Sequence, residues 1–357
     1  MRRKAAVILL LAMSVMALAG CGANTGADKT TDTEAQQTEK REETKDAAQS
    51  RPQASDTIVL RLAETQTETY PATMGAVEFA RLVNERSGGR IKIEVFPGGQ
   101  LGGDEQAVIE QVQFGAIDLT RVNLAPMTEF APVLNLFQMP FLFENAEHMH
   151  KVIDSDLGVK MLSSVEESNF IGLGLYEAGT RNFYNSVRPI TKLEDMKGLK
   201  LRTPQSQLVI DMVEALGAVP TPMAFGEVYS SLQTGVIDGA ENNWVSYDQN
   251  SHYEVAKYLT LDAHTAPPEI LICSKMVFDK LTPEDQELMK QAARDSVVYE
   301  REQYGKVEQT SKDKVLADGS EVSELENRAE FEEAVAPLYE KYAGGFMDEL
   351  EQIKAMK

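Results

Sequence analysis

Cysteine is scarce in this chain, which leaves little scope for disulfides or cysteine-based metal sites. Two cysteines occur among 357 residues, Cys21 and Cys273. Because Cys21 belongs to an N-terminal processing motif described below, Cys273 has no disulfide partner in the mature chain. Cys273 ends the apolar run over 269–273, a position typical of a buried and unreactive thiol.

Recognisable catalytic motifs are also missing. The sequence has no Gly-x-Ser-x-Gly elbow, no Gly-x-x-x-x-Gly-Lys-Ser/Thr phosphate loop and no His-Glu-x-x-His zinc helix. His148 and His150 lie beside Glu147, but no further histidine or cysteine is near them in sequence. They therefore indicate a solvated helix edge rather than a metal site. We expect no catalytic residue, no cofactor and no metal.

Positive charge is in short supply. The chain has 35 lysines and arginines against 56 acidic residues, a formal net charge of −21. This excludes nucleic acid as a partner, because neutralising its phosphates needs a basic face. A small anion can still be bound if a local, partly buried cluster of hydrogen-bond donors holds it.

The N-terminus has the layout of an export signal. Basic residues at 2–4 precede an apolar run over 5–17, which is too short for a membrane-spanning helix of roughly 20 residues. Leu-Ala-Gly-Cys at 18–21 matches the bacterial lipobox. Residues 1–21 therefore predict a lipoprotein signal peptide, with Cys21 as the lipidated residue that anchors the mature chain at the extracytoplasmic face of the membrane. A plain secretory signal with an incidental Cys21 is the alternative.

Residues 22–56 contain no aromatic residue and almost no branched aliphatic residue. Such a segment cannot bury enough apolar surface to offset its conformational entropy, so we expect a flexible tether. The remaining stretch, 57–357, is long for a single hydrophobic core and predicts two lobes.

Strand and helix patterns alternate along both halves of this stretch. Strands are expected at 57–62, 91–95, 116–119, 170–176 and 199–202, and helices at 73–86, 104–114, 206–216 and 227–234. This alternation predicts an α/β fold with a mainly parallel sheet in each lobe.

One short pattern occurs twice. Gln-Phe-Gly-Ala-Ile-Asp at 113–118 returns as Gln-Thr-Gly-Val-Ile-Asp at 233–238. Both read as a helix end, a glycine cap and a short strand. If the repeat is real, each lobe uses it to deliver a loop to a common cleft, with Arg121 and Asn123 on one side and residues 241–243 on the other.

The C-terminal part reads as helical. Thr-Pro-Glu-Asp at 282–285 is a strong helix start, and the pattern continues to about residue 315. A helix of ~30 residues spans ~45 Å, so we expect a strut shared by both lobes. Residues 330–342 predict an amphipathic terminal helix with Phe331, Val335, Leu338 and Tyr342 facing inward.

Two arginines and an amide pair are candidate ligands for an organic anion. Arg202 ends a strand, and its planar guanidinium matches both oxygens of a carboxylate. Arg181 follows a glycine and precedes two aromatic residues, while Asn242 and Asn243 can both donate and accept hydrogen bonds. Taken singly, each has a structural alternative: an exposed strand end, a surface ion pair or turn residues.

The order of these motifs closely resembles the substrate-binding subunit of tripartite ATP-independent periplasmic (TRAP) transporters, the DctP family. The resemblance covers nearly the whole mature domain. It rests on Gly-Thr-Arg at 179–181, Met-Lys-Gly-Leu-Lys-Leu-Arg-Thr-Pro at 196–204, the run over 216–229, the run over 232–242, Val-Phe-Pro at 95–97 and Gln-Leu-Gly-Gly-Asp at 100–104.

The resemblance implies two α/β lobes joined by hinge strands and a long connecting helix, closing on an organic acid. It places lobe I at 57–178 plus about 267–306, and lobe II at 179–266 plus about 307–357. Arg202 matches the family arginine that grips the carboxylate, Arg181 a second, frequently used ligand arginine, and Asn242 the amide that follows Gln/Glu-Glu in the family. Further residues are expected to line the cleft: Glu64, Asp104, Arg121 and Asn123.

The chain departs from the family pattern after Asn242. Asn243 and Trp244 stand where similar proteins usually have a proline, and we include Trp244 among the expected ligand-binding residues. Glu64 would place a carboxylate near the anion, which suits a hydroxyl-rich ligand better than a dianion. The runs over 121–126 and 252–256 look like the subgroup that takes sugar acids.

The leading hypothesis is a monomeric, lipid-anchored receptor that captures a uronate or related sugar acid by cleft closure and delivers it to integral-membrane TRAP subunits. A C4-dicarboxylate or another monocarboxylate is the main alternative within this class. An extracellular enzyme acting on sugar acids, or a receptor that presents its ligand to a sensor kinase, are alternatives of other classes.

Overall fold

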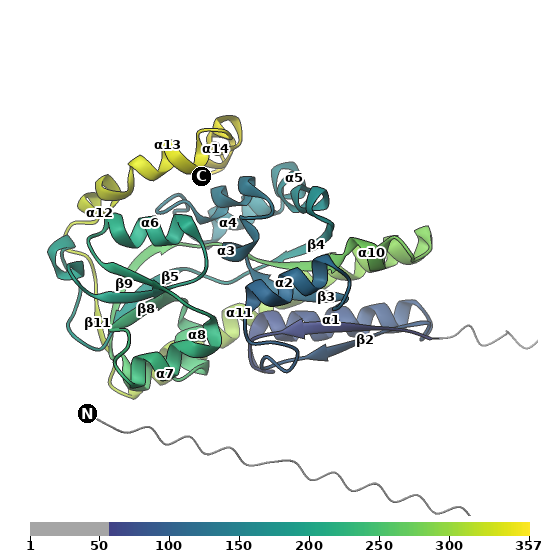
Figure 1. Cartoon of the computed structure of the whole chain (residues 1–357), viewed down its shortest axis with the longest axis horizontal. Helices are drawn as coiled ribbons and strands as arrows, with labels where there is room; N and C mark the ends of the chain where they lie inside the picture. The colour runs from purple at the N-terminus through teal and green to yellow at the C-terminus, as the bar shows by residue number, and fades with distance from the viewer. Residues whose placement is uncertain (1–56) are drawn as a thin grey trace, which may run out of the picture. The chain divides into compact units, whose positions relative to one another are not determined.

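Two β-sheets organise the computed structural model, which describes residues 57–357 (Figure 1). The predicted signal peptide, the lipidation site Cys21 and the predicted tether lie outside the described residues. No helix within 57–357 is long and apolar enough to cross a membrane.

The first sheet has the strand order β2-β1-β3-β10-β4. Its strands are β1 Ile58–Glu64, β2 Ile91–Phe96, β3 Leu119–Asn123, β4 Phe170–Tyr176 and β10 Glu269–Ser274. Strand β1 runs parallel to β2 and β3, and β10 runs antiparallel to β3 and β4. The parallel connections are made by α1 Pro71–Arg86 and α2 Glu105–Gln113.

The second sheet repeats this arrangement, in the order β11-β9-β5-β8-β6-β7. Its strands are β5 Arg181–Asn185, β6 Lys200–Thr203, β7 Val219–Pro222, β8 Gly239–Asn242, β9 Tyr258–Thr265 and β11 Glu321–Ser323. Strand β6 runs parallel to β7 and β8, and β5 runs antiparallel to β8 and β9. The connecting helices are α6 Gln207–Ala215 and α7 Val228–Gln233. Strand β11 pairs parallel to β9. Each sheet is therefore mixed: three parallel strands are followed by one strand that runs antiparallel to both of its neighbours.

The duplicated Gly-x-Ile-Asp pattern performs the same task in both sheets, as predicted. Gly115 and Gly235 have positive φ angles of 70° and 71° and end α2 and α7. The carboxylate of Asp118 accepts the backbone N–H of Arg61 at 2.7 Å, and that of Asp238 accepts the N–H of Lys200 at 2.8 Å. Each aspartate thus ties the incoming strand to its parallel neighbour.

The prediction of a strand over 116–119 is wrong. The backbone N–H groups of Ala116 and Ile117 donate to the carbonyl of Gln111, so these residues form the turn that follows α2. Strand β3 begins only at Leu119. Arg121 and Asn123 consequently lie within the strand rather than in a loop after it.

The chain passes between the sheets at 177–180 and again at 266–268. The two passages lie side by side, because Tyr176 pairs with Glu269 on one side and Arg181 pairs with Thr265 on the other. This arrangement matches the expected hinge strands. The exact division of the chain into two lobes at these points stays a prediction.

The long helix expected after Thr282 is confirmed. Helix α11, Pro283–Ala317, is 35 residues long and begins with the Thr282 side chain accepting the N–H of Asp285. It packs against α1 and β4 along one part of its length and against α8, Trp244–Gln249, nearer its C-terminal end (Figure 1). One continuous element therefore supports both sheets.

The expected single helix over 330–342 is wrong. Pro337 has no N–H and separates α12, Arg328–Val335, from α13, Pro337–Ala343; α14, Met347–Ala355, follows. Phe331, Val335 and Leu338 are buried as expected, and Tyr342 is partly buried. Helices α12 and α13 pack against α6, and α13 also packs against the 3-10 segment η1, Pro132–Gln138.

The short elements complete the fold. They are α3 Leu124–Met127, α4 Ala146–Ile153, α5 Asp156–Ser163, α9 His252–Val255, α10 Lys275–Phe278 and the 3-10 turns η2 Ser164–Ser168, η3 Leu193–Met196 and η4 Phe225–Glu227. His148 in α4 is not on a solvated edge as expected: it is buried, and its Nε2 lies 2.8 Å from the carbonyl oxygen of Ile353. Cys273 is buried and free, as predicted.

Candidate anion-binding site

A narrow cavity lies where the carboxyl ends of the parallel strands of both sheets meet, the usual ligand position in open α/β sheets. Its volume is about 20 Å³, measured as the room open to the centre of a water molecule, so the walls are nearly closed on one another. It is lined by Gln66, Glu105, Asn123, Arg181, Arg202, Pro204, Phe225, Asn242, Ser246 and Glu269.

Arg202 leaves the end of β6 and is held in place from behind. Its Nε and Nη2 donate to the backbone carbonyl of Met223 at 3.1 and 3.0 Å, and its guanidinium carbon lies 5.8 Å from the centre of the Phe225 ring. Among the described residues no hydrogen bond involves Nη1 and no carboxylate forms an ion pair with this side chain. Arg202 is therefore a buried, positioned cation with donor capacity left for a ligand.

Arg181 begins β5 and is anchored more tightly. Its Nε and Nη2 form a forked ion pair with the carboxylate of Glu241 on the neighbouring strand β8. Its Nη1 donates to Oδ1 of Asn242 at 3.0 Å. The sequence singled out Arg181 and Asn242 separately, and the structure brings them into direct contact at the cavity wall.

A chain of buried charges continues behind Arg181. Oε2 of Glu241 lies 3.4 Å from Nε2 of His264, and Nδ1 of His264 lies 2.7 Å from Oδ2 of Asp262. Burial would raise the pKa of Glu241, but Arg181 and His264 outweigh it and lower the pKa to about 2. Burial would likewise lower the pKa of His264, but Asp262 and Glu241 raise it to about 9. Charges of alternating sign therefore hold Arg181 in its orientation.

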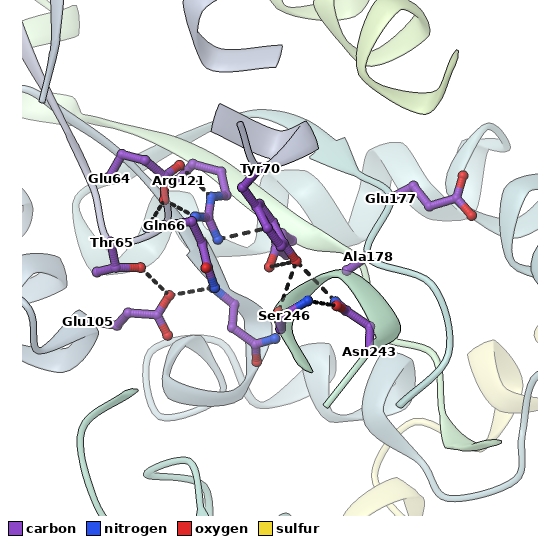
Figure 2. A network of polar contacts seen from close by, with 12 residues as sticks. Glu64, Thr65, Gln66, Tyr70, Glu105, Arg121, Glu177, Ala178, Asn243 and Ser246 are labelled. Atoms are coloured by element: carbon purple, nitrogen blue, oxygen red, sulfur yellow. Dashed lines mark hydrogen bonds and ion pairs between the residues drawn. The ribbon is translucent and has the colours of Figure 1, made fainter. Parts of the chain in front are cut away.

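The first sheet contributes acidic groups to the opposite wall. Glu105 is the first residue of α2, and its Oε1 lies 3.3 Å from the N–H of Asn123 and 3.4 Å from the hydroxyl of Thr65. Glu269 begins β10, where the hydroxyl of Tyr70 donates to it at 3.4 Å. Figure 2 shows Glu105 with Thr65 beside it, and Tyr70 close to Ser246 of the second lobe.

The predicted ligands Glu64 and Arg121 lie behind this wall rather than on it. Both are fully buried, and Arg121 donates to the Glu64 carboxylate through two nitrogens, as Figure 2 shows. Its Nη1 lies 3.1 Å from Oε2 of Glu269. Glu64 and Arg121 face each other in the register of β1 and β3, which explains why they pair with one another.

Trp244 is also placed elsewhere. Asn243 caps helix α8 by accepting the N–H of Ser246 at 2.7 Å, so Trp244 becomes the first helical residue. Its side chain joins a hydrophobic cluster that includes Tyr247 and Tyr253. The side-chain amide of Asn243 also donates to the hydroxyl of Tyr70 at 3.0 Å.

The other predicted residues fall at or near the cavity. Asn123 lines it while its Oδ1 accepts the N–H of Ala125 at 2.8 Å. Asp104 caps α2 by accepting the N–H of Gln106 at 3.0 Å, and it lines adjacent grooves rather than the cavity itself.

Six lining residues escaped the sequence analysis. They are Gln66, Glu105, Pro204, Phe225, Ser246 and Glu269. The helix-capping signal at Asp104 could have identified Glu105. The capping carboxylate of Asp104 accepts a backbone N–H, and the next residue, Glu105, projects from the first turn of the helix. Glu269 had no such signal, because its place depends on β10 returning between β3 and β4.

A larger cavity of about 930 Å³ lies apart from this site. Its walls come from residues 140–144, Ala263 and helices α12 to α14. Arg328 lies over the Phe141 ring there and is paired with Glu332. Arg181 and Arg202 do not line it, so volume alone is a poor guide to the anion site in this chain.

Comparisons with known proteins found a matching family model and several relatives. The family model of the bacterial extracellular solute-binding proteins, family 7 (DctP), matches residues 62–344. The 2,3-diketo-L-gulonate-binding periplasmic protein YiaO of Escherichia coli is 33% identical over 276 residues, 77% of this chain and 84% of YiaO. The C4-dicarboxylate-binding periplasmic protein DctP of Rhodobacter capsulatus is 31% identical, over 82% of this chain and 88% of that protein.

Solved structures are similar over most of the chain. A TRAP periplasmic solute-binding protein from Xanthobacter autotrophicus with bound β-D-galacturonate is 40% identical, with a TM-score of 0.81 over 84% of this chain and all of that chain. A TRAP periplasmic solute-binding protein from Roseobacter denitrificans with bound β-D-glucuronate is 36% identical, again with a TM-score of 0.81, 84% of this chain and all of that chain.

Proposed function

The chain belongs to the DctP family of bacterial extracellular solute-binding proteins, and from this premise we propose that it captures a sugar acid, most simply a hexuronate, for a TRAP transporter. The observation that carries the proposal is the division of the cavity into two walls of different chemistry. Arg181 and Arg202 form one wall, while Glu105, Glu269 and amide groups form the other. The bound galacturonate and glucuronate of the similar structures support the same class of ligand.

The arginine wall suits the carboxylate of such a ligand. Nη1 of Arg202 has no partner among the described residues, and Nη1 of Arg181 donates to the amide oxygen of Asn242 at the cavity wall. Charge-assisted hydrogen bonds from guanidinium to carboxylate are stronger than neutral ones and are geometrically selective. Arg202 therefore grips the ligand carboxylate, and Arg181 with Asn242 orients it.

The acidic and amide wall suits hydroxyl groups. Carboxylates such as Glu105 accept hydrogen bonds, while the side chains of Gln66 and Asn123 can donate and accept. A sugar ring offers several hydroxyls that satisfy both kinds of partner. A C4-dicarboxylate has a second carboxylate and would bring like charges together on this side.

Closure of the two lobes supplies the affinity. The cavity of about 20 Å³ is smaller than a hexuronate, so entry requires the walls to separate at the paired passages between the sheets. A ligand that contacts Arg202 on one wall and Glu105 on the other interacts more strongly with the closed state. That difference in affinity shifts the population toward closure.

The N-terminal region anchors this receptor to the membrane. Lipidation at Cys21 and a tether over 22–56 keep the binding domain, as a monomer, at the extracytoplasmic surface near integral-membrane TRAP subunits. Metabolic labelling of the chain with palmitate should be lost in Cys21→Ser, while ligand affinity stays unchanged. Equal labelling of the variant and the parent protein would contradict lipidation at Cys21.

Calorimetric titration of the purified domain with D-glucuronate, D-galacturonate and succinate tests the function. We expect a hexuronate to bind and Arg202→Ala to weaken it at least ~100-fold, because the variant removes a charge-assisted contact in a desolvated site. Arg81→Ala, on the exposed face of α1, is the matched control and should bind normally. Unchanged affinity in Arg202→Ala, or binding of succinate alone, would refute the proposal.

A further inference from the structure

Two charged residues of the cavity lining have no ion-pair partner within residues 57–357. Arg181 and Glu269 are each held in an ion pair already described. Arg202 and Glu105 form no ion pair with any residue between 57 and 357, although they line the same cavity from opposite lobes. Any ligand that reaches across the cavity therefore meets Arg202 at one end and Glu105 at the other.

Several secondary-structure elements contribute neighbours to Glu105. Some of these neighbours favour its ionised form and others its protonated form. Its position at the start of α2 and the nearby Arg202 favour the carboxylate. Partial burial and the neighbouring Glu269 favour the protonated form. The groups that face it are Asp104 of the same turn, Thr65 after β1, the N–H of Asn123 at the end of β3, Glu269 of β10 and Arg202 of β6.

The opposing influences leave this carboxyl easy to protonate at neutral pH. Burial and the Glu269 carboxylate together raise the pKa of Glu105 to about 7, although the N–H of Asn123 and the charge of Arg202 act against them. Burial also raises the pKa of Glu269 itself, against the influence of Arg121. A second negative charge beside Glu105 would raise its pKa further.

The far end of the ligand consequently experiences the charge of Glu105. A hydroxyl group there donates a hydrogen bond to the carboxylate, which is favourable when Glu105 is ionised. A second ligand carboxylate would repel the ionised group in a partly buried place where screening is weak. The same ligand carboxylate accepts a hydrogen bond from Glu105 once the group is protonated.

We propose, on the basis of the sugar-acid function above, that Glu105 selects the ligand by its charge. Ionised, it accepts a hydroxyl of a monoanionic sugar acid and rejects a dianion. Protonated, it donates to the second carboxylate and admits the dianion. Binding of a dianion is therefore coupled to uptake of one proton at this residue, whereas binding of the monoanion is not.

The test compares D-glucuronate with D-glucarate, which carries a second carboxylate in place of the aldehyde carbon and remains dianionic near neutral pH. Affinity is measured by calorimetry at about pH 6 and about pH 8. Linkage to a group with a pKa of about 7 predicts that glucarate binds about tenfold more tightly at the lower pH, while glucuronate changes little. In Glu105→Gln the glucarate affinity becomes independent of pH and rises about tenfold at the higher pH.

Glu110→Gln is the matched control, because it removes an exposed carboxylate from the same helix. It should keep the pH dependence of the parent protein. If glucuronate binds but glucarate shows no pH dependence, or if Glu105→Gln retains that dependence, the role of Glu105 is refuted and the proposed function stands. If no hexuronate binds at any pH, the proposed function itself fails. Proton uptake on glucarate binding, measured in buffers of different ionisation enthalpy, should be close to one proton at about pH 8 and lost in Glu105→Gln.

Discussion

Nδ1 of His264 lies 2.7 Å from Oδ2 of Asp262, with both side chains fully buried beneath the arginine wall. The contact keeps the imidazole protonated at neutral pH, because the pKa of His264 is raised to about 9 by Asp262 and Glu241 despite its burial. A positive charge behind Glu241 in turn leaves Arg181 less completely neutralised by that glutamate. Arg181 can therefore still attract an anionic ligand.

The free energy of unfolding should depend on pH through the protonation of His264. A group whose pKa is raised on folding stabilises the protein fully below its unfolded value near 6.5, and the contribution is lost as the pH rises through about 9. The shift corresponds to roughly 3 kcal/mol. Denaturant unfolding of His264→Gln should show a deficit of this order at about pH 6 that shrinks toward about pH 10. A deficit of constant size across this range would contradict the protonated state.

The fork of Arg181 should matter beyond its charge. Arg181→Lys keeps a cation but loses the paired contacts to Glu241 and the donor to Asn242. We expect hexuronate affinity to fall about 10- to 100-fold, since lysine cannot reproduce the planar geometry. Calorimetry measures the loss, and circular dichroism checks the fold. Affinity equal to that of the parent protein would show that only the charge counts.

Gly179 should tolerate substitution poorly. Its φ is +62°, and an added Cβ would lie 2.2 Å from the hydroxyl oxygen of Tyr304 on α11. Gly198 has a similar φ of +76° but open space around it, which makes it a matched control. We expect Gly198→Ala to cost about 1 kcal/mol of unfolding free energy through backbone strain alone, and Gly179→Ala about 3 kcal/mol. Equal losses of unfolding free energy in the two variants would mean that the side chain of Tyr304 moves away from the added methyl group at little cost.

The two aspartates of the duplicated pattern, Asp118 and Asp238, should contribute equally to the free energy of unfolding. Asp118→Ala and Asp238→Ala each remove a carboxylate that accepts a strand N–H, so each should lower the unfolding free energy by about 1–2 kcal/mol. Asp279→Ala, which removes only an exposed pair with Lys275, should change it by less than about 0.5 kcal/mol. A large loss at one position and none at the other would show that the two halves use the motif differently.

The sequence predicted those parts of the fold that depend on local chemistry. The cap at Thr282 and the absence of strong interruptions placed α11 almost to its last turn. The glycines at 115 and 235 marked helix ends because their positive φ angles are available to glycine at little cost. Arg202 was singled out because it lies next to the end of a strand that Pro204 interrupts.

The parts that escaped prediction depend on which strands become neighbours. Glu64 and Arg121 were both expected to face the ligand, but the register of β1 and β3 sets them directly opposite one another. Glu241 was read as part of a loop, although the pairing of β8 with β5 brings it to Arg181. Such pairings join residues about 60 positions apart, and no local pattern encodes them.

Strand β10 also has a consequence for how the chain acquires its structure. It lies between β3 and β4, yet it is synthesised after every strand of the second sheet except β11. During synthesis and export, the facing edges of β3 and β4 remain unpaired until residues 269–274 are available. A fragment ending near residue 178 would expose both edges and is expected to aggregate unless a peptide carrying β10 is supplied in trans. The amino-terminal half is therefore not an independent folding unit, although it comes first in the chain.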